Sequence, residues 1–342
     1  MASKRGGTKA KSKARKPAKG RSKAKPGQAV ERGEWARRSF LSISDWSREE
    51  LDDFLDLADR MKAAPFDHKP LAGPRTVALV FDRPTLRTQV SFAAGIAELG
   101  GNPMTVDGGL AAMGSREGVE DVARILGRQA AAIVWRTAHQ GDVVTMAAYA
   151  GVPVLNALTD EFHPCQLLAD LQTVRERKGR LAGVRAAFVG DGACNMGNSW
   201  VLAGAAAGMH VVIGAPDGFT PDAHVGARAR EIAQDTGGSI EMTTDPVEAV
   251  KGTDVVITDS WVSMGREEES QERLRIFPPY GVTEDLLAQA AADAIVLHCL
   301  PAYRGKEISE EVIEGPHSVV WDEAENRRHA QKAVLTWLLA RS

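Results

Sequence analysis

Short runs of β-branched and other apolar residues alternate with segments that repeat apolar side chains every three or four positions, and this alternation limits the possible folds more than any other feature. In the first half of the chain we expect strands at residues 76–81, 131–135 and 152–156, and helices near 90–99, 119–126 and 143–150. Strands separated by helices form a parallel sheet covered on both faces. The sequence therefore predicts an α/β fold.

A second series of the same kind follows a long helical pattern at residues 163–178. Its expected strands lie at residues 185–189, 210–213, 239–242, 254–258 and 294–298, and a last amphipathic helix at 326–339. A chain of 342 residues also exceeds what one hydrophobic core usually serves. We expect two domains, each a parallel sheet flanked by helices, joined by long helices. The expected boundaries are a tail at 1–34, domains at 35–165 and 166–325, and a C-terminal helix at 326–342 that packs back on the first domain.

The N-terminal segment differs in charge from the rest of the chain. Residues 1–30 hold eleven Lys or Arg and no acid, which leaves 31 basic against 45 acidic residues, a net charge of −14, for the remainder. Few apolar side chains are present to offset the entropy of ordering, so we expect this tail to be disordered. Three interpretations stay open: a solubilising extension, an arm that makes weak, nonspecific contact with polyanions, or a segment that contacts the acidic body of the chain.

Composition excludes several classes of protein. No apolar run is long enough to cross a bilayer, and the N-terminus lacks the hydrophobic stretch of a secretory signal, so we expect a cytoplasmic protein without membrane contact. The three cysteines lack the paired spacing of disulfide scaffolds, which predicts reduced thiols. A zinc site from His163, Cys165, His298 and Cys299 is an alternative, but neither pair has the usual ligand separation.

Polar residues follow the expected strands, at the edge where open α/β sheets bind ligands. The first strand leads into Thr85, Leu86, Arg87 and Thr88, which open a helix. Free backbone amides, the positive end of the helix dipole and the two hydroxyls would hold an anion there, with Arg87 as its counter-charge. The sequence thus predicts an anion site at this helix start.

Other strand ends supply further candidates. Arg136 follows the second strand, and His163 and Gln166 open the helix after the third. In the second sheet, the first strand leads into a glycine-rich turn at residues 190–195 that lacks the third glycine and the later acid of a dinucleotide-binding fingerprint. A dehydrogenase is therefore a poor fit.

Five segments, in order, resemble the aspartate/ornithine carbamoyltransferase family from about residue 39 onward. They are residues 81–92, the His-Pro-Cys-Gln run at 163–166 with the following Leu168-Ala169-Asp170, Ser-Met-Gly at 263–265, His-Cys-Leu-Pro at 298–301, and Glu-Ala-Glu-Asn-Arg at 323–327. The Ser-Met-Gly and His-Cys-Leu-Pro segments are similar to those of ornithine-using members. The resemblance implies transfer of the carbamoyl group of carbamoyl phosphate to the δ-amine of L-ornithine, giving L-citrulline for arginine biosynthesis. It also implies no metal or cofactor, and a homotrimer with shared sites.

The resemblance assigns roles to particular residues. Carbamoyl phosphate would be bound by Thr85, Leu86, Arg87, Thr88, Arg136, His163, Pro164, Cys165, Gln166, Cys299, Leu300 and Arg327, and L-ornithine by Asn195, Asp259, Ser263 and Met264. The expected catalytic residues are Arg87, Arg136, His163, Asp259 and Cys299. Thr88, Arg136 and His163 would polarise the carbonyl oxygen. The thiolate of Cys299 would orient the δ-amine or remove its proton.

Several positions depart from the family pattern. Leu86 and Gln89 replace a hydroxyl and a charge in the phosphate motif, Ala112 or its neighbours replace a polar residue in a loop that reaches a neighbouring subunit, and Cys194 and Asn198 replace an asparagine and a histidine. Two alternatives therefore stay open. One is a carbamoyltransferase with a different amine acceptor, and the other is a non-catalytic paralogue that binds polyanions through its tail.

Overall fold

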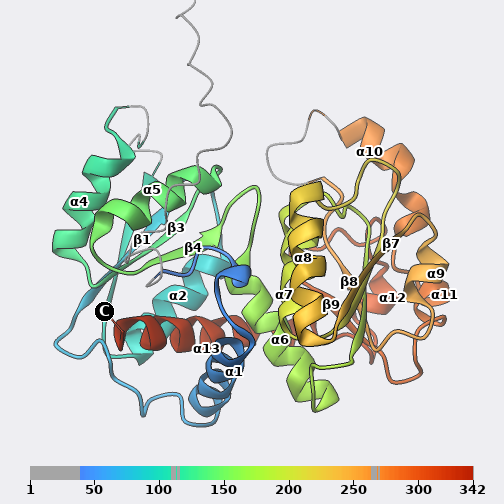
Figure 1. Cartoon of the computed structure of the whole chain (residues 1–342), viewed down its shortest axis with the longest axis horizontal. Helices are drawn as coiled ribbons and strands as arrows, with labels where there is room; N and C mark the ends of the chain where they lie inside the picture. The colour runs from blue at the N-terminus through green and yellow to red at the C-terminus, as the bar shows by residue number, and fades with distance from the viewer. Residues whose placement is uncertain (1–38, 109–112, 114–115, 263–267, 269, 342) are drawn as a thin grey trace, which may run out of the picture. The chain divides into compact units, whose positions relative to one another are not determined.

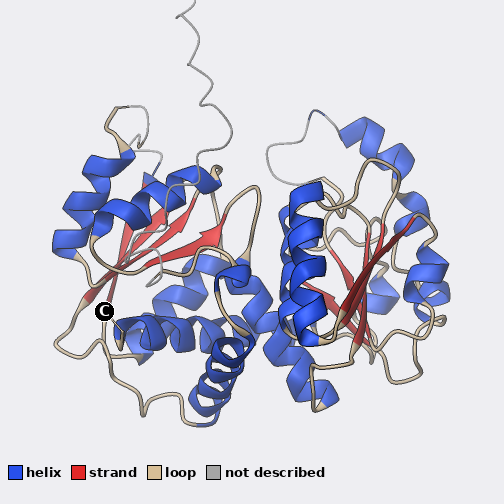
Figure 2. Ribbon diagram, viewed as in Figure 1, coloured by secondary structure: helices blue, strands red, loops and turns tan. Residues whose placement is uncertain are grey.

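The computed structural model describes residues 39–108, 113, 116–262, 268 and 270–341. The expectations for the basic tail, Ala112, Ser263 and Met264 lie outside these residues. Within them the chain forms two α/β domains, each with a parallel sheet flanked by helices, as the sequence predicted (Figure 1, Figure 2). None of the helices described is both long and apolar enough to span a bilayer.

The first domain is built on a four-stranded parallel sheet in the order β2-β1-β3-β4. Its strands are β1 (Thr76–Phe81), β2 (Asn102–Asp107), β3 (Ala132–Arg136) and β4 (Val154–Leu158). Successive residues of β1 face opposite sides, so Val77 and Leu79 pack toward α1 (Arg48–Ala63) and α2 (Arg87–Glu98). Ala78 and Val80 pack toward the other face, which is covered by α4 (Val119–Gln129) and α5 (Gln140–Ala150).

The second domain has a five-stranded parallel sheet in the order β7-β6-β5-β8-β9. Its strands are β5 (Arg185–Val189), β6 (His210–Gly214), β7 (Ser239–Thr243), β8 (Val255–Thr258) and β9 (Ile295–His298). One face is covered by α7 (Asn195–Ala206) and α8 (Ala223–Thr236). The other face carries the short helices α9 (Pro246–Val250), α11 (Glu284–Leu287) and α12 (Glu310–Ile313). The described residues also form the short helices η2 (Ile43–Asp45), α10 (Ser270–Ile276) and η4 (Pro278–Tyr280).

Two long helices connect the domains. Helix α6 (Pro164–Lys178) contacts β4 and α7, and ends at Gly179, whose φ of 71° is a left-handed conformation that glycine adopts without strain. Helix α13 (Val320–Leu339) contacts α1, α2 and α6 (Figure 1). Buried Lys332 anchors it, because its Nζ lies 2.6 Å from Oε2 of Glu98 on α2.

The structure departs from the sequence predictions at β2 and α13. Strand β2 was not predicted, because it is a short edge strand that begins with Asn102 and Pro103, and its apolar side chains Met104 and Val106 are only partly buried. Helix α13 begins at Val320 rather than Asn326. Its first turn is acidic, yet Glu323 is buried there and accepts hydrogen bonds from the Gln166 side chain and from the backbone of His298.

Candidate active site

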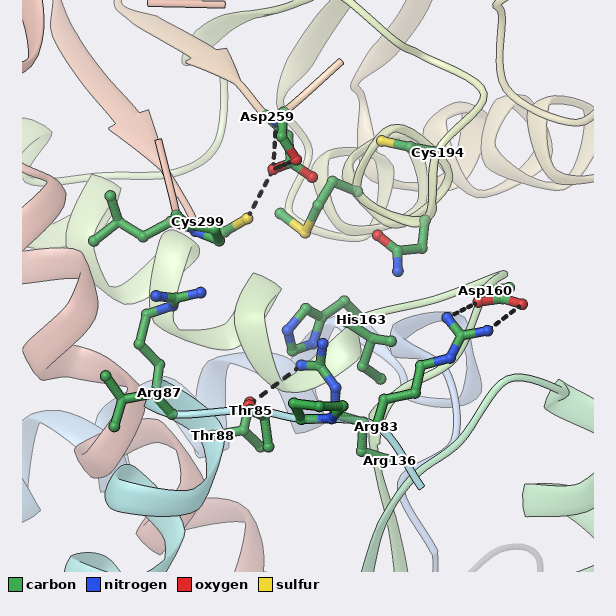
Figure 3. Close-up of a pocket in the computed structure, with 18 of the residues that line it drawn as sticks. Arg83, Thr85, Arg87, Thr88, Arg136, Asp160, His163, Cys194, Asp259 and Cys299 are labelled. Carbon is green, nitrogen blue, oxygen red and sulfur yellow. Dashed lines mark hydrogen bonds and ion pairs between the residues drawn. The ribbon is translucent and has the colours of Figure 1, made fainter. Parts of the chain in front are cut away.

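A cavity of about 600 Å³ lies at the carboxyl ends of the strands and takes its lining from both domains (Figure 3). Its lining includes the loop at residues 83–88, Arg136, Asp160, His163, residues 193–196, Asp259, residues 299–301 and Arg327. In Figure 3, Thr85, Arg87 and Arg136 lie on one side of this cavity, and Asp259 and Cys299 lie on the other. The cavity thus has a cationic end and an end with a carboxylate and a thiol.

Three guanidinium groups form the cationic end. Arg87, Arg136 and Arg327 come from three separate segments of the chain and all line the cavity. No carboxylate among the residues described forms an ion pair with any of them. Burial and the neighbouring charge of Arg327 lower the pKa of Arg136 to about 10. Unpaired guanidiniums at this density favour binding of a multiply charged anion.

Hydroxyl groups at the start of α2 hold two of these arginines in place. Arg327 Nη2 donates a 2.8 Å hydrogen bond to Thr88 Oγ1, and Arg136 Nη1 lies 3.5 Å from Thr85 Oγ1. The helix begins after Leu86, whose side chain makes no capping hydrogen bond. The amides of the first turn are therefore left for an anion, as at other helix N-termini.

His163 lies between the two ends of the cavity. Its ring is buried, and its Nδ1 has no hydrogen-bond partner among the described atoms. Burial and the charges of Arg327, Arg136 and Arg87 lower the pKa of His163 well below its ordinary value. The imidazole is therefore neutral near pH 7 and can donate a hydrogen bond from one ring nitrogen.

Asp259 and Cys299 meet at the other end of the cavity. Asp259 Oδ1 accepts hydrogen bonds from Ser260 N at 2.7 Å and from Cys299 Sγ at 3.3 Å. Burial and the charge of Asp259 raise the pKa of the Cys299 thiol well above its ordinary value. Cys299 is therefore a thiol in this state, and the expected thiolate is not favoured.

The remaining predicted residues lie in different places. Asn195 and Leu300 line the cavity, and Asn195 Nδ2 donates to Thr159 O at 2.8 Å. Pro164, Cys165 and Gln166 form the first turn of α6 and are not among the lining residues. Burial raises the pKa of the Cys165 thiol to about 12, so this side chain is an inert part of the core.

The loop after β9 is shaped by a buried acid that sequence reasoning missed. Glu307 Oε1 accepts a hydrogen bond from Tyr303 N at 2.5 Å and lies 3.3 Å from His298 Nε2. His298 Nδ1 accepts from Leu300 N at 2.8 Å, and Leu300 has a φ of 59°. A leucine in this left-handed region is strained, as is common at functional sites. Nothing in the sequence near Glu307 signals this role.

Four of the departures from the family pattern fall among the described residues, and one of them, Gln89, is exposed on α2 and does not line the cavity. Leu86 is 71% exposed at the cavity edge. Cys194 lines the cavity and caps α7, accepting from Gly197 N at 3.5 Å. Asn198 is buried and links two loops, because it donates to Glu161 O at 3.4 Å and accepts from Asp222 N at 3.0 Å.

A second missed feature is an ion pair at the rim of the cavity. Arg83, which the sequence suggested was a solvated surface charge, lies 2.8 Å from Asp160 Oδ1 through Nη1. Asp259, His298 and Cys299 also place potential metal-ligand atoms within 4.8 Å of one another. Both ring nitrogens of His298, however, already have partners within the loop.

Comparison with known proteins identifies the family. Residues 38–176 match the carbamoyl-P binding domain of aspartate/ornithine carbamoyltransferases, and residues 182–338 match their Asp/Orn binding domain. The ornithine carbamoyltransferase of Clavibacter michiganensis is 57% identical over 305 residues, 89% of this chain and 99% of that protein. The ornithine carbamoyltransferase structure from Pyrococcus furiosus is 43% identical with a TM-score of 0.84, covering 87% of this chain and 96% of that one. That from Gloeobacter violaceus is 45% identical with a TM-score of 0.80, covering 88% and 98%. The chain belongs to the aspartate/ornithine carbamoyltransferase family.

Proposed function

We propose that the chain is an ornithine carbamoyltransferase, which transfers the carbamoyl group of carbamoyl phosphate to the δ-amine of L-ornithine to give L-citrulline and phosphate. The observation that carries this proposal is the cavity itself. Arg87, Arg136 and Arg327 line it at one end without carboxylate partners among the residues described, while Asp259 and Cys299 lie across it. An acceptor other than ornithine is not favoured, because curated relatives that are 52–57% identical are named as ornithine enzymes.

In the proposed mechanism the three guanidiniums and the first-turn amides of α2 bind the phosphate group. The neutral His163 ring, Thr88 and Arg136 donate to the carbonyl oxygen and stabilise the negative charge that forms on it. The amine nitrogen attacks the carbonyl carbon, and the bond from that carbon to the phosphate oxygen then breaks. The proton that the attacking nitrogen must lose on forming the new bond passes to the leaving phosphate, which departs as hydrogen phosphate. The arginines stabilise the leaving phosphate as its charge grows.

At the acceptor end, Asp259 would bind the α-amino group of L-ornithine and Asn195 its α-carboxylate, with Ser263 and Met264 completing this site. The Cys299 thiol would orient the δ-amine as a hydrogen-bond partner rather than remove its proton, because its raised pKa disfavours the thiolate. The δ-amine must arrive uncharged to attack, so its proton passes to solvent before the reaction.

The test is citrulline formation from carbamoyl phosphate and L-ornithine, with the full chain and with a version lacking residues 1–30. Both versions are expected to form citrulline. Product formed only from another amine would show that the acceptor is not L-ornithine. No product from any amine would favour the alternative of a non-catalytic binding protein. N-acetyl-L-ornithine and putrescine are suitable competing amines.

Family membership supports several finer proposals. We place the reaction in arginine biosynthesis in the cytoplasm, carried out by a homotrimer whose chains have domains at residues 35–165 and 166–325. Light scattering on the purified chain tests the trimer. The weaker proposal is that the basic tail contacts polyanions. Its test is the affinity of both versions for DNA or polyphosphate at several salt concentrations: the full chain should bind more tightly, and this difference should shrink as salt rises.

A further inference from the structure

His298, the last residue of β9, is enclosed by the loop that it begins. It is 1% exposed and immediately precedes Cys299, whose Sγ points toward Asp259 in Figure 3. Leu300 N lies 2.8 Å from His298 Nδ1, and Glu307 Oε1 lies 3.3 Å from His298 Nε2. Both ring nitrogens therefore contact the loop after β9, one through a backbone amide and the other through a carboxyl group.

The backbone partner of Nδ1 decides where the ring carries its proton. A backbone N–H can only donate, so the contact with Leu300 N requires a lone pair on His298 Nδ1. A neutral imidazole without a proton on Nδ1 carries it on Nε2, and this nitrogen faces Glu307 Oε1, which accepts. Together the two contacts are satisfied by one form of the ring, the neutral tautomer with its proton on Nε2.

The hydrogen bond to Nδ1 also supports an unusual backbone conformation. Leu300 has a φ of 59°, in the left-handed region that side chains other than glycine rarely adopt. A proton on His298 Nδ1 would place two donors against each other and remove this hydrogen bond. Since Leu300 lines the cavity together with Cys299, the shape of the cavity wall depends on the tautomer of a ring outside it.

Glu307 fixes that tautomer from a buried and well-anchored position. It is 1% exposed, its Oε1 also accepts from Tyr303 N at 2.5 Å, and its backbone oxygen accepts from Val282 N at 2.9 Å. A carboxylate held in this way can accept a proton from Nε2–H but has none to donate to a bare Nε2. It therefore favours the proton on Nε2 of His298 and leaves Nδ1 free to accept.

We propose that Glu307 is a positioning residue for the reaction proposed above, on which the kinetic part of this inference rests. It holds His298 in the form with its proton on Nε2, and His298 in turn holds Leu300 and Cys299 in place along the cavity. Neither His298 nor Glu307 is among the lining residues, so both act through the backbone of the loop rather than by touching a substrate.

Glu307→Gln and Glu307→Met test this role as a matched pair. Both remove the negative charge, but only Gln keeps an oxygen that can accept from His298 Nε2 and Tyr303 N. For Glu307→Gln we expect kcat and the KM for carbamoyl phosphate to change less than about tenfold. Glu310→Met, at an exposed position on the neighbouring helix α12, is the control and should match the unsubstituted chain.

Glu307→Met is expected to behave differently, because it leaves His298 Nε2 and Tyr303 N without this acceptor. The loop then moves to satisfy them, and substrate binding must restore it. We expect kcat/KM for carbamoyl phosphate to fall about 10- to 100-fold, the effect of a buried donor that loses its partner. The affinity for inorganic phosphate should stay unchanged in a calorimetric titration, because Arg87 and Arg136 lie across the cavity from Cys299 (Figure 3).

NMR of the imidazole nitrogens tests the tautomer in the unliganded protein, without any reaction. The chain has eight histidines, so the signals of His298 are identified by their absence in His298→Gln. Near neutral pH we expect the two nitrogen shifts of a neutral ring with its proton on Nε2.

Three outcomes overturn the proposal. They are a His298 ring that is protonated on Nδ1, a Glu307→Gln variant that is impaired more than about tenfold, and a Glu307→Met variant that either keeps full kcat/KM or loses phosphate affinity to the same extent. If Glu307→Met does not fold, the NMR result and Glu307→Gln still decide. If the unsubstituted chain forms no citrulline, the proposed function fails, and the NMR result still decides how Glu307 and His298 are paired.

Discussion

Cys299 Sγ donates a 3.3 Å hydrogen bond to Asp259 Oδ1, and this contact joins the residues that follow the neighbouring strands β8 and β9. A thiol that donates to a carboxylate is stabilised in its protonated form. The same contact therefore fixes the position of both side chains and suppresses the reactivity of the sulfur. Its chemical consequence can be measured directly.

Asp259→Asn is predicted to speed alkylation of Cys299. The carboxylate charge raises the pKa of this thiol, so its removal lowers that pKa and increases the thiolate fraction at a given pH. Site-resolved mass spectrometry after iodoacetamide treatment measures the rate. Cys165, whose pKa burial raises to about 12, is the internal control and is expected to stay unmodified in both proteins. An unchanged or slower rate at Cys299 would contradict the prediction.

Arg87→Ala is predicted to weaken phosphate binding without lowering stability. The arginine has no ion-pair partner among the residues described, and it lies near Arg136 and Arg327, so its removal relieves repulsion in the ligand-free protein. Loss of one charged hydrogen bond is worth about 1.5–3 kcal/mol, or roughly 10- to 100-fold in affinity. Calorimetric titration with inorganic phosphate and a melting curve measure the two effects. A lower Tm with unchanged affinity would assign Arg87 a structural role instead.

His163→Gln is predicted to make stability less sensitive to acid. Burial and three arginines hold the pKa of His163 below its ordinary value of about 6.5, which the unfolded chain regains. The unfolded chain therefore binds a proton that the folded chain does not, and the free energy of unfolding falls as the pH drops below about 6.5. The variant loses this contribution, so its Tm should decline less steeply with falling pH. His224→Gln, the same substitution at an exposed position, is the control, and a slope change as large in this variant as in His163→Gln would contradict the prediction.

Lys332→Met is predicted to destabilise the fold while leaving the KM for carbamoyl phosphate unchanged in the protein that folds. Lys332 is fully buried and binds Glu98 at 2.6 Å, so its loss leaves a largely buried carboxylate with a weaker partner, at a cost of roughly 3 kcal/mol. The control is Arg328→Met, because Arg328 is one-third exposed and lies 3.3 Å from the same carboxylate. Its loss should cost less than about 1 kcal/mol. Urea denaturation measures both, and equal losses would contradict the prediction.

The sequence predicted those parts of the fold that local patterns encode. Strands β1 and β5 have the predicted bounds, because four of the six residues in β1 and four of the five in β5 are buried and apolar. Helix α7 was not predicted, since residues 196–206 are all buried and no polar face marks a helical period. The edge strand β2 was missed for the opposite reason, because Met104 and Val106 give only a short apolar signal between polar residues.

The candidate site likewise has residues that local sequence indicates and contacts that it does not. Arg87, Arg136, His163, Asp259 and Cys299 could be singled out because each lies at or after the end of a strand, and parallel strands bring their carboxyl ends to one edge. Their catalytic roles came from the family resemblance. The contacts that support these residues could not be predicted from the sequence. Gln166 and Glu323 are 157 positions apart in the chain, and the Asp160 partner of Arg83 is 77 positions away. Pairings at such separations depend on the assembled fold rather than on local sequence.

Arg327 lies on α13, after every strand of both sheets in chain order, yet its guanidinium completes the cationic end built mainly by the first domain. During synthesis on the ribosome, the first domain can therefore form its sheet well before it acquires full affinity for phosphate. We therefore expect anion binding to become strong only when the last helix docks, so that a ligand captured there stabilises finished molecules over partly made ones.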